Sequence, residues 1–196
     1  MKMMAAVPPQ KRIFVTGPPG VGKTTLIIRV LEKLRSAHPQ LKVRGFYTRE
    51  VRHTGERTGF EVVTVDGCTS VLATSTLTSG ESSRWPNVGK YKVDVLGFES
   101  LALPELEIKE DTGLFIIDEV GKMELFCASF FPAVLRVLDS NIPVLASIPV
   151  PKFGRDIPEV ASIRNRRDIA LYTLNKNNRD RIMEQISSQL SSLCPK

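Results

Sequence analysis

The sequence has no apolar run long enough to cross a membrane. Its longest apolar stretches, such as residues 114–117 and 144–148, are far shorter than the roughly 20 residues that a membrane-spanning helix needs. The start of the chain, residues 1–12, holds two lysines and an arginine but no apolar core of the kind that follows the charges in a secretory signal. We therefore expect a soluble protein with no membrane partner, in which residues 1–10 form a disordered lead-in.

Cysteine is scarce and shows no paired spacing. The three residues, Cys68, Cys127 and Cys194, are an odd number, lie far apart and form no C-x-x-C motif. This pattern favours neither a disulfide framework nor a zinc site. An intracellular location, in the cytoplasm, is the corresponding prediction.

The charge excess is moderate, and few aromatic residues accompany it. The net charge is +6, and the basic residues gather late in the chain, between residues 164 and 181. No alternating aromatics lie nearby to stack on bases, so a nucleic-acid partner stays open but is not favoured over a solvated basic face. A length of 196 residues suits one domain, which we assign to residues 11–196 and expect to be a monomer.

Short apolar runs alternate with amphipathic segments along the chain. Runs with β-branched content at residues 13–16, 114–118, 144–148 and 169–174 predict buried parallel strands. Apolar residues at helical spacing follow the first, second and last of these runs. The sequence therefore predicts an α/β fold, with a mainly parallel sheet flanked by helices.

The middle of the chain is less regular. Residues 43–65 have an extended pattern around a polar centre, which predicts a β-hairpin inserted into the α/β fold. Residues 69–87 are rich in serine and threonine and have few large apolar side chains, which predicts a long mobile surface loop.

A glycine-rich segment satisfies the G-x-x-x-x-G-K-[ST] motif between a predicted strand and a predicted helix. Its glycines let backbone N–H groups surround an anion, and the following helix adds its positive dipole end. Lys23 is expected to reach the β- and γ-phosphates of a nucleotide, and the Thr24 hydroxyl to ligate Mg²⁺. The predicted nucleotide-binding residues are Gly17, Pro18, Pro19, Gly20, Val21, Gly22, Lys23, Thr24 and Thr25.

A second motif is an apolar strand that ends in two carboxylates. Asp118 is expected to orient the Mg²⁺ shell, as the Walker B aspartate does. Glu119 is then available as a general base toward an attacking water; the alternative is that it only caps the next segment. The predicted Walker B segment is Leu114, Phe115, Ile116, Ile117, Asp118, Glu119, Val120 and Gly121.

Charged residues elsewhere are weaker candidates. Arg164 and Arg166 follow a short helical stretch, and either is a candidate arginine finger that neutralises transition-state charge. Arg52 and Arg57 on the predicted hairpin are alternative suppliers. The pair at residues 122 and 124, Lys and Glu, either supports the phosphate site or merely starts a helix.

Several nucleotide-specific motifs are absent. The segment after Asp118 is not the D-x-x-G switch of signalling GTPases. Residues 175–178 begin like the guanine-reading N-K-x-D motif, but Asn178 stands where a carboxylate is needed to pair with the guanine amino group. No signature of ABC proteins or helicases is present. We therefore expect weak selection among bases.

Five sequence blocks together resemble the cancer-related nucleoside-triphosphatase family, which includes thermostable prokaryotic relatives. The resemblance extends over residues 11–187, and its most distinctive parts are the G-F-Y-T and D-E-V-G-K-M-E-L blocks. It implies a RecA-like P-loop fold and Mg²⁺-dependent hydrolysis of several nucleoside triphosphates. The blocks are residues 17–26, 45–48, 118–125, 163–166 and 178–179.

Phosphoryl transfer to water, giving a nucleoside diphosphate and phosphate, is the leading hypothesis. Two rivals fit the same motifs: a small-molecule or nucleotide kinase, and a nucleotide-dependent RNA-binding module in which slow hydrolysis acts as a timer. An acceptor that accelerates ATP loss would favour the kinase, whereas turnover stimulated by RNA would favour the binding module.

Overall fold

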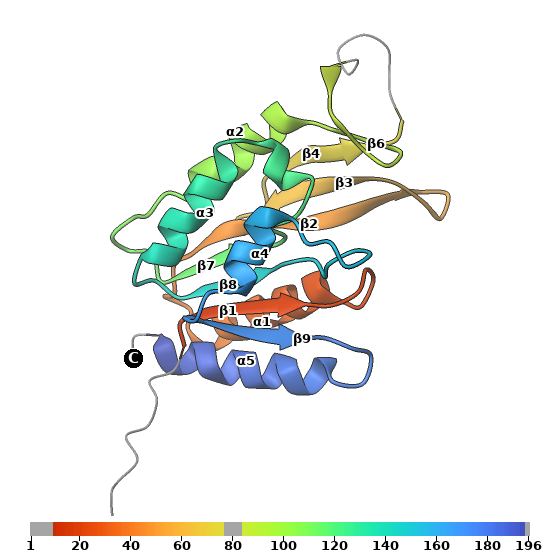
Figure 1. The fold of residues 1–196 in the computed structure, drawn as a ribbon. Coiled ribbons are helices and arrows are strands. Elements are labelled where there is room, and N and C mark those ends of the chain that lie inside the picture. The colour runs from red at the N-terminus through yellow and green to blue at the C-terminus, as the bar shows by residue number, and fades with distance from the viewer. Residues whose placement is uncertain (1–9, 77–83, 195–196) are drawn as a thin grey trace, which may run out of the picture.

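The computed structural model describes residues 10–76 and 84–194, in which nine strands form one mixed sheet (Figure 1). The strand order is β5-β6-β4-β3-β2-β7-β8-β1-β9. Residues 1–9 of the predicted lead-in lie outside the described residues. The strands are β1 (Arg12–Thr16), β2 (Val43–His53), β3 (Glu56–Thr64), β4 (Thr69–Thr74), β5 (Asn87–Val88), β6 (Tyr91–Val93), β7 (Leu114–Ile117), β8 (Val144–Ser147) and β9 (Ile169–Thr173).

Five neighbouring strands form the parallel half of the sheet. β2, β7, β8, β1 and β9 pair in parallel, which confirms the four predicted parallel strands. The prediction that all four are buried is wrong for β9, an edge strand in which only Ile169 is buried. In β7 and β8 every residue is buried, as expected for strands covered on both faces. Because the five strands run in one direction, their carboxyl ends all lie at one edge of the sheet.

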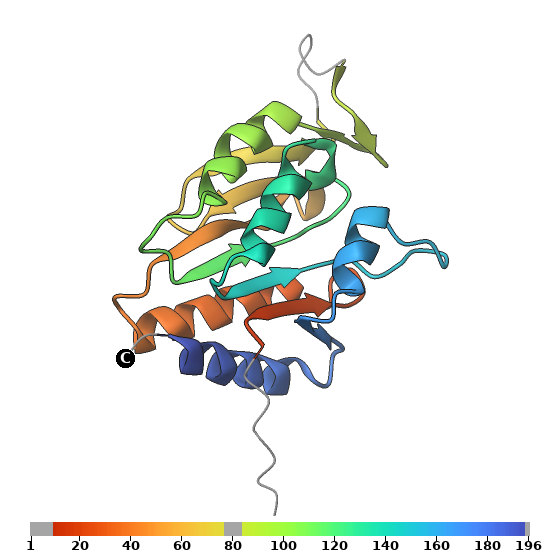
Figure 2. The same cartoon turned by 60° about the vertical axis from the view of Figure 1, so that its left-hand side comes forward.

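Helices cover both faces of this half (Figures 1 and 2). Ile13 and Val15 of β1 pack in the cluster that includes the apolar residues of α1 and α5, whereas Phe14 between them packs in the cluster of α2, α3 and α4. This alternation follows from the two-residue period of a strand. The helices are α1 (Lys23–Ala37), α2 (Val95–Glu105), α3 (Phe130–Asp139), α4 (Pro158–Arg164) and α5 (Arg179–Leu193), with a short 3₁₀ turn η2 (Glu124–Phe126).

The predicted β-hairpin is confirmed and extends the main sheet. β2 and β3 pair antiparallel around Thr54 and Gly55, which have φ values of 48° and 85°. Two positive φ values are typical of the type I′ turn that suits a two-residue hairpin. The first residues of β2 also pair with β7, so the Gly-Phe-Tyr-Thr block lies next to the Walker B strand. Gly45 is required there, because a Cβ would lie 1.9 Å from the Ile116 carbonyl oxygen.

The loop predicted for residues 69–87 is wrong at both of its ends. Thr69–Thr74 forms β4, which pairs antiparallel with β3 and β6, and β5 begins at Asn87. Residues 77–83 lie outside the described residues. The many hydroxyl side chains do not indicate a strand, yet Leu72 and Ala73 of β4 are buried in the core cluster that includes α2. Threonine and valine suit a pleated surface, but pairing with distant strands decides such a segment.

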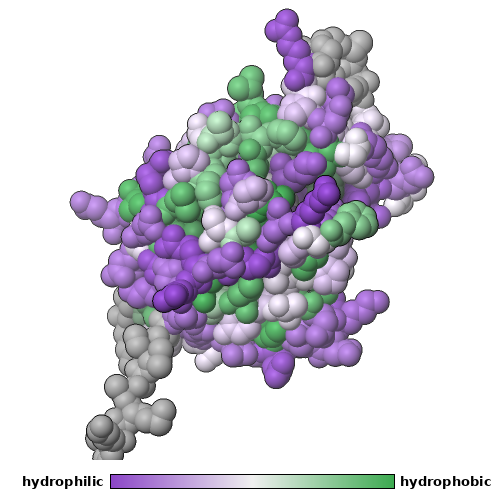
Figure 3. All heavy atoms as spheres, viewed as in Figure 1, coloured by the Kyte–Doolittle hydropathy of each residue, from purple (hydrophilic) through white to green (hydrophobic). Residues whose placement is uncertain are grey.

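The sequence patterns did not predict α2, which covers the antiparallel half. Its residues are apolar without a clear helical period, and Gly97 and Pro104 interrupt the pattern. The helix is positioned by packing of Phe98 edge-on against Phe46 and Phe130, with ring centroids 5.5 and 5.2 Å away. Apolar groups over α2 and α3 also reach the surface in Figure 3, amid mainly polar surroundings. In the described residues no helix combines the length and apolarity that a membrane span requires.

Candidate active site

The P-loop, residues 17–24, joins the carboxyl end of β1 to the start of α1. Gly22 caps α1 with φ of 101°, a conformation that other residues rarely adopt. No side chain of the described residues caps this end, and the first turn holds no acidic residue. The N–H groups of a helix start and the positive end of the helix dipole suit an anion, in the context that the motif predicts.

Lys23 lies between the P-loop and the Walker B segment. Its Nζ donates a hydrogen bond to the Gly17 carbonyl oxygen at 3.3 Å and lies 3.5 Å from Glu119 Oε2. The Lys23 side chain is only 12 % exposed, whereas that of Glu119 is 28 % exposed. The structure therefore brings the two predicted functional charges together at the carboxyl edge of the sheet.

Asp118, just after β7, is 1 % exposed. Burial raises the pKa of its carboxyl group, whereas the Ser147 and Thr24 hydroxyls and the Lys23 charge oppose this rise. Ser147 donates a hydrogen bond to Oδ1, but Oδ2 is buried with no hydrogen-bond partner among the described residues. The Thr24 hydroxyl is near enough to act on this pKa but does not complete a hydrogen bond to Oδ2. An oxygen of this kind needs a further ligand.

Ser147 is a site residue that the motifs did not identify. It is fully buried at the end of β8, and its carbonyl oxygen accepts a hydrogen bond from the Val120 N–H at 2.9 Å. A serine that ends an otherwise apolar strand is a weak signal in the sequence. Only the pairing of β8 between β7 and β1 places this hydroxyl against Asp118.

The surroundings of Glu119 contain groups that raise its pKa and groups that lower it. Burial raises the pKa of its carboxyl group, and the neighbouring Asp118 adds to this rise. The positive charges of Lys23 and Lys152 oppose it. A carboxylate with a raised pKa accepts a proton more readily than an ordinary glutamate, which suits a general base.

Glu124 is buried beside Glu119, whereas Lys122 is exposed. Gly121 makes room for both carboxylates: a Cβ there would lie 2.7 Å from Glu119 Oε1 and 3.1 Å from Glu124 Oε2. Burial raises the pKa of Glu124 well above its usual range, and the charges of Glu119 and Asp118 add to this effect. Glu124 is thus held as a neutral acid at pH values where exposed glutamates are ionised.

We expect Glu124→Gln to stabilise the protein at neutral pH. The folded protein keeps the Glu124 proton to a higher pH than the unfolded chain does. Its contribution to stability is therefore complete below the unfolded pKa of about 4.3 and is lost as pH rises through the folded pKa. Glutamine carries no titrating proton, so the Glu124→Gln variant does not lose stability in this way. Its melting temperature should therefore exceed that of the wild type at pH 7.5. The difference should disappear near pH 4.5, and a lower melting temperature at pH 7.5 would contradict a neutral Glu124.

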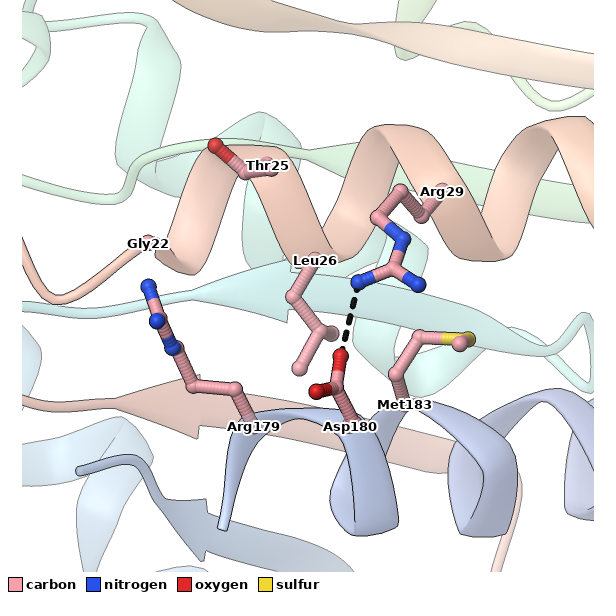
Figure 4. Close-up of a pocket in the computed structure, with 7 residues that line it drawn as sticks. All are labelled: Gly22, Thr25, Leu26, Arg29, Arg179, Asp180 and Met183. Carbon is pink, nitrogen blue, oxygen red and sulfur yellow. Dashed lines mark hydrogen bonds and ion pairs between the residues drawn. The ribbon is translucent and has the colours of Figure 1, made fainter. Parts of the chain in front are cut away.

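A small pocket of about 150 Å³ adjoins the outer side of the P-loop, between the first turns of α1 and α5 (Figure 4). Arg179 points toward Gly22 there, and its Nη1 donates a hydrogen bond to the Val21 carbonyl oxygen at 3.3 Å. Arg29 and Asp180 form an ion pair of 2.8 Å across the pocket. The lining residues are Gly22, Thr25, Leu26, Arg29, Arg179, Asp180 and Met183.

The structure does not place Arg166, one of the two predicted arginine fingers, beside the P-loop, and its contacts do not favour a role at the phosphates. Its guanidinium pairs with Asp168 at 2.8 Å and with Asp139 at 3.0 Å. Asp168 also pairs with Arg12, which begins β1, whereas the P-loop follows the opposite end of that strand. Arg166 therefore lies at the amino edge of the sheet. The sequence pattern does not indicate the position of Arg166, because a helix as short as α4 has too few apolar residues to predict which edge of the sheet its last turn approaches.

Arg164 does lie near the carboxyl end of β8, but its guanidinium is already bound. Its Nε donates to Asp156 Oδ2 at 2.9 Å, and its Nη2 donates to the Pro149 carbonyl oxygen. The alternative suppliers, Arg52 and Arg57, both pair with Glu50 on the β2–β3 hairpin. A catalytic role for Arg164 stays a prediction, and its contacts favour an anchoring role.

Comparisons with known proteins agree with this architecture. A family model described as NTPase matches residues 12–187. The cancer-related nucleoside-triphosphatase homolog of Bos taurus is 43 % identical, over 93 % of this chain and 97 % of its own. The solution structure of a human cancer-related nucleoside triphosphatase is 41 % identical with a TM-score of 0.77, covering 93 % of this chain and 98 % of that one.

A prokaryotic relative shows the same fold. The crystal structure of THEP1 from Aquifex aeolicus is 38 % identical with a TM-score of 0.76, and the match covers 91 % of this chain and 98 % of that one. The resemblance drawn from the P-loop, the G-F-Y-T block and the Walker B block is thereby confirmed. The chain belongs to this NTPase family.

Proposed function

We propose that this protein is a magnesium-dependent nucleoside-triphosphatase that converts several nucleoside triphosphates to the diphosphate and phosphate with weak base selectivity. The observation that carries this proposal is the meeting of Lys23, Asp118 and Glu119 beside an uncapped helix start. Membership of the NTPase family and the names of the relatives support hydrolysis as the reaction.

The chain's own residues account for the main steps of hydrolysis. The P-loop N–H groups and Lys23 hold the β- and γ-phosphates. Glu119 accepts a proton from a water molecule while the water oxygen forms a bond to the γ-phosphorus. The bond between that phosphorus and the β–γ bridging oxygen then breaks. The electron pair leaves with the nucleoside diphosphate. Lys23 neutralises part of the charge that develops on the phosphate oxygens.

The residues around Asp118 fit a magnesium ion. Asp118 Oδ2 is buried without a hydrogen-bond partner among the described residues, and the Thr24 hydroxyl acts on the same carboxyl group. No cluster of three or more histidine, cysteine or acidic side chains occurs in residues 10–76 and 84–194 that could hold a metal unaided. Mg²⁺ typically binds one or two protein oxygens and completes its shell with phosphates and water. When bound, it would neutralise charge on the β- and γ-phosphates.

The surroundings of the P-loop support weak base selectivity. The pocket in Figure 4 lies next to Gly22 and Thr25, where we place the nucleoside, and its Arg29 and Asp180 already pair with each other. In the segment that resembles N-K-x-D, the Asn175 and Asn178 side chains bind the backbone of their own loop and of β9. Strong selection needs buried donors and acceptors matched to one base, and these groups are already engaged.

Phosphate release from ATP, GTP, CTP and UTP tests the proposal. We expect hydrolysis of all four with magnesium and loss of activity when EDTA removes it. The values of kcat/KM should differ by only about 5-fold to 30-fold, which corresponds to about 1 to 2 kcal/mol. A preference above roughly 10³ for one base would contradict weak selectivity. ATP loss that requires a small-molecule acceptor would instead indicate a kinase.

A further inference from the structure

The segment between β8 and α4 forms a small hairpin at the carboxyl edge of the sheet. Lys152 and Arg155 exchange backbone hydrogen bonds of 3.0 and 2.9 Å, and the turn between them contains Phe153 and Gly154 with φ values of 51° and 71°. Figures 1 and 2 show the segment extending beyond the strands at the edge where the P-loop lies. We call residues 149–156 the β8–α4 hairpin.

The strand order places the base of this hairpin beside the candidate active site. β8 lies between β7, which leads to Asp118, and β1, which leads to the P-loop. The end of β8 is bonded to both neighbours: the Val120 N–H donates to the Ser147 carbonyl, and the Ile148 N–H donates to the Val15 carbonyl. The hairpin therefore leaves the sheet between the residues that we assign to the phosphates and those that we assign to the proton transfer.

The base of the hairpin is held at both ends by one side chain. Arg164 donates hydrogen bonds to the Pro149 carbonyl and to the Asp156 carboxylate, which lie at opposite ends of residues 149–156. The Pro149 and Pro151 rings also restrict the backbone on the ascending side. The tip has no such support, and Phe153 is fully exposed. Because the base is fixed, Lys152 and Arg155 stay in a defined position relative to the sheet, although the tip beyond them is exposed.

Lys152 and Arg155 place two positive charges on the same side of the hairpin. Residues directly opposite each other in an antiparallel pair project to the same face, and like charges in such a pair destabilise it. Neither side chain forms an ion pair or a side-chain hydrogen bond within the part of the chain that the structure describes, unlike Arg164 below them. An anion bound between the two cations would relieve their repulsion. The charge of Lys152 already acts on Glu119, where it opposes the raised pKa of that carboxyl group.

We propose that Lys152 and Arg155 bind the terminal phosphate oxygens of the nucleotide and stabilise the charge that develops on them during hydrolysis, with Arg164 as the positioning residue. This inference rests on the proposed function, because it assumes that the γ-phosphate lies between Lys23 and Glu119. It replaces Arg164 and Arg166 as the suppliers of the catalytic cation. Both guanidiniums are occupied by carboxylates, whereas the two hairpin cations pair with no carboxylate in residues 10–76 and 84–194.

The test compares Lys152→Ala, Arg155→Ala and the double variant with Arg136→Ala, an exposed cation on α3. For each protein we would measure kcat for MgATP and the Kd values for MgADP with and without aluminium fluoride. Aluminium fluoride mimics the phosphoryl group in the transition state of its transfer. The double variant should lose about 10²-fold to 10³-fold in kcat, because cations that act on transition-state charge have effects of this order. Its Kd for MgADP should change by less than about threefold.

Aluminium fluoride should tighten MgADP binding by the wild type and by Arg136→Ala, but much less by the double variant. Arg164→Ala should lose the same tightening, although the Kd for MgADP alone should not change. A double variant that hydrolyses ATP at the wild-type rate would overturn the assignment, as would one whose affinity for MgADP falls equally with and without aluminium fluoride. A wild-type protein with no phosphate release would overturn the proposed function itself, whereas a normal wild type with an unaffected double variant would overturn only the hairpin's role.

Discussion

Glu119→Gln should lower kcat for ATP by about 10² to 10⁴, while the Kd for magnesium-nucleotide stays near that of the wild type. General-base catalysis is usually worth this factor, and glutamine keeps the side-chain shape but cannot accept the proton. The Lys23 Nζ lies 3.5 Å from Glu119 Oε2 but also donates a hydrogen bond to the Gly17 carbonyl oxygen, which the substitution does not remove. Nucleotide binding should therefore persist. Single-turnover phosphate release, with a separate binding titration, measures the two quantities independently.

The pH dependence gives a second test of Glu119. The base must be unprotonated to act, and its pKa is raised by burial. The wild-type rate should therefore fall on acidification at a pH above about 4.3, the value for an ordinary glutamate. This fall should be absent from the residual activity of Glu119→Gln.

Two matched variants separate the role of Glu119 from general effects of losing a carboxylate. Glu124→Gln removes the buried neighbour, and Glu32→Gln removes an exposed carboxylate on α1. Both should retain much more activity than Glu119→Gln. Equal losses in Glu119→Gln and Glu124→Gln would show that the two carboxylates act as a unit, and would remove the assignment of a single base.

Lys23→Ala should lose most of the nucleotide affinity and at least about 10²-fold in kcat/KM. The substitution removes a cation that the P-loop directs at the β- and γ-phosphates. It also removes the charge that opposes the raised pKa of Glu119, so the remaining activity should need a higher pH. Binding of a fluorescent ATP analogue and steady-state phosphate release measure both effects.

Lys33→Ala on the same helix is the control for Lys23→Ala. Lys33 pairs with Glu184 at the surface between α1 and α5, and its side chain is about half exposed. Both variants make the same chemical change, but only the first affects the P-loop, so Lys33→Ala should hydrolyse ATP normally. Lys23→Ala with native circular dichroism and a wild-type rate would disprove the P-loop assignment.

The sequence predicted an element of the fold correctly where the residues of one short segment are sufficient to identify it. The parallel strands and the hairpin around Thr54 and Gly55 have local signatures in apolar runs and turn residues. β4 and α2 do not, because their positions depend on pairing with β6 and on packing of Phe98 against Phe46. Such contacts join residues far apart in the chain, and local propensity does not determine them.

The residues of the candidate site likewise fall into those that the sequence predicts and those that only the tertiary structure brings together. A phosphate-binding loop is built from successive backbone N–H groups and the helix that follows them, so residues 17–24 alone determine it. The Walker B carboxylates likewise end one buried strand. Ser147, Lys152 and Arg155 belong to the site only because β8 lies between β7 and β1. Arg166 is excluded because its ion pairs hold it at the opposite edge of the sheet. The sequence alone therefore determined the P-loop motif and the paired carboxylates, to which we assign phosphate and magnesium binding, whereas the order of strands decided which other charges surround them.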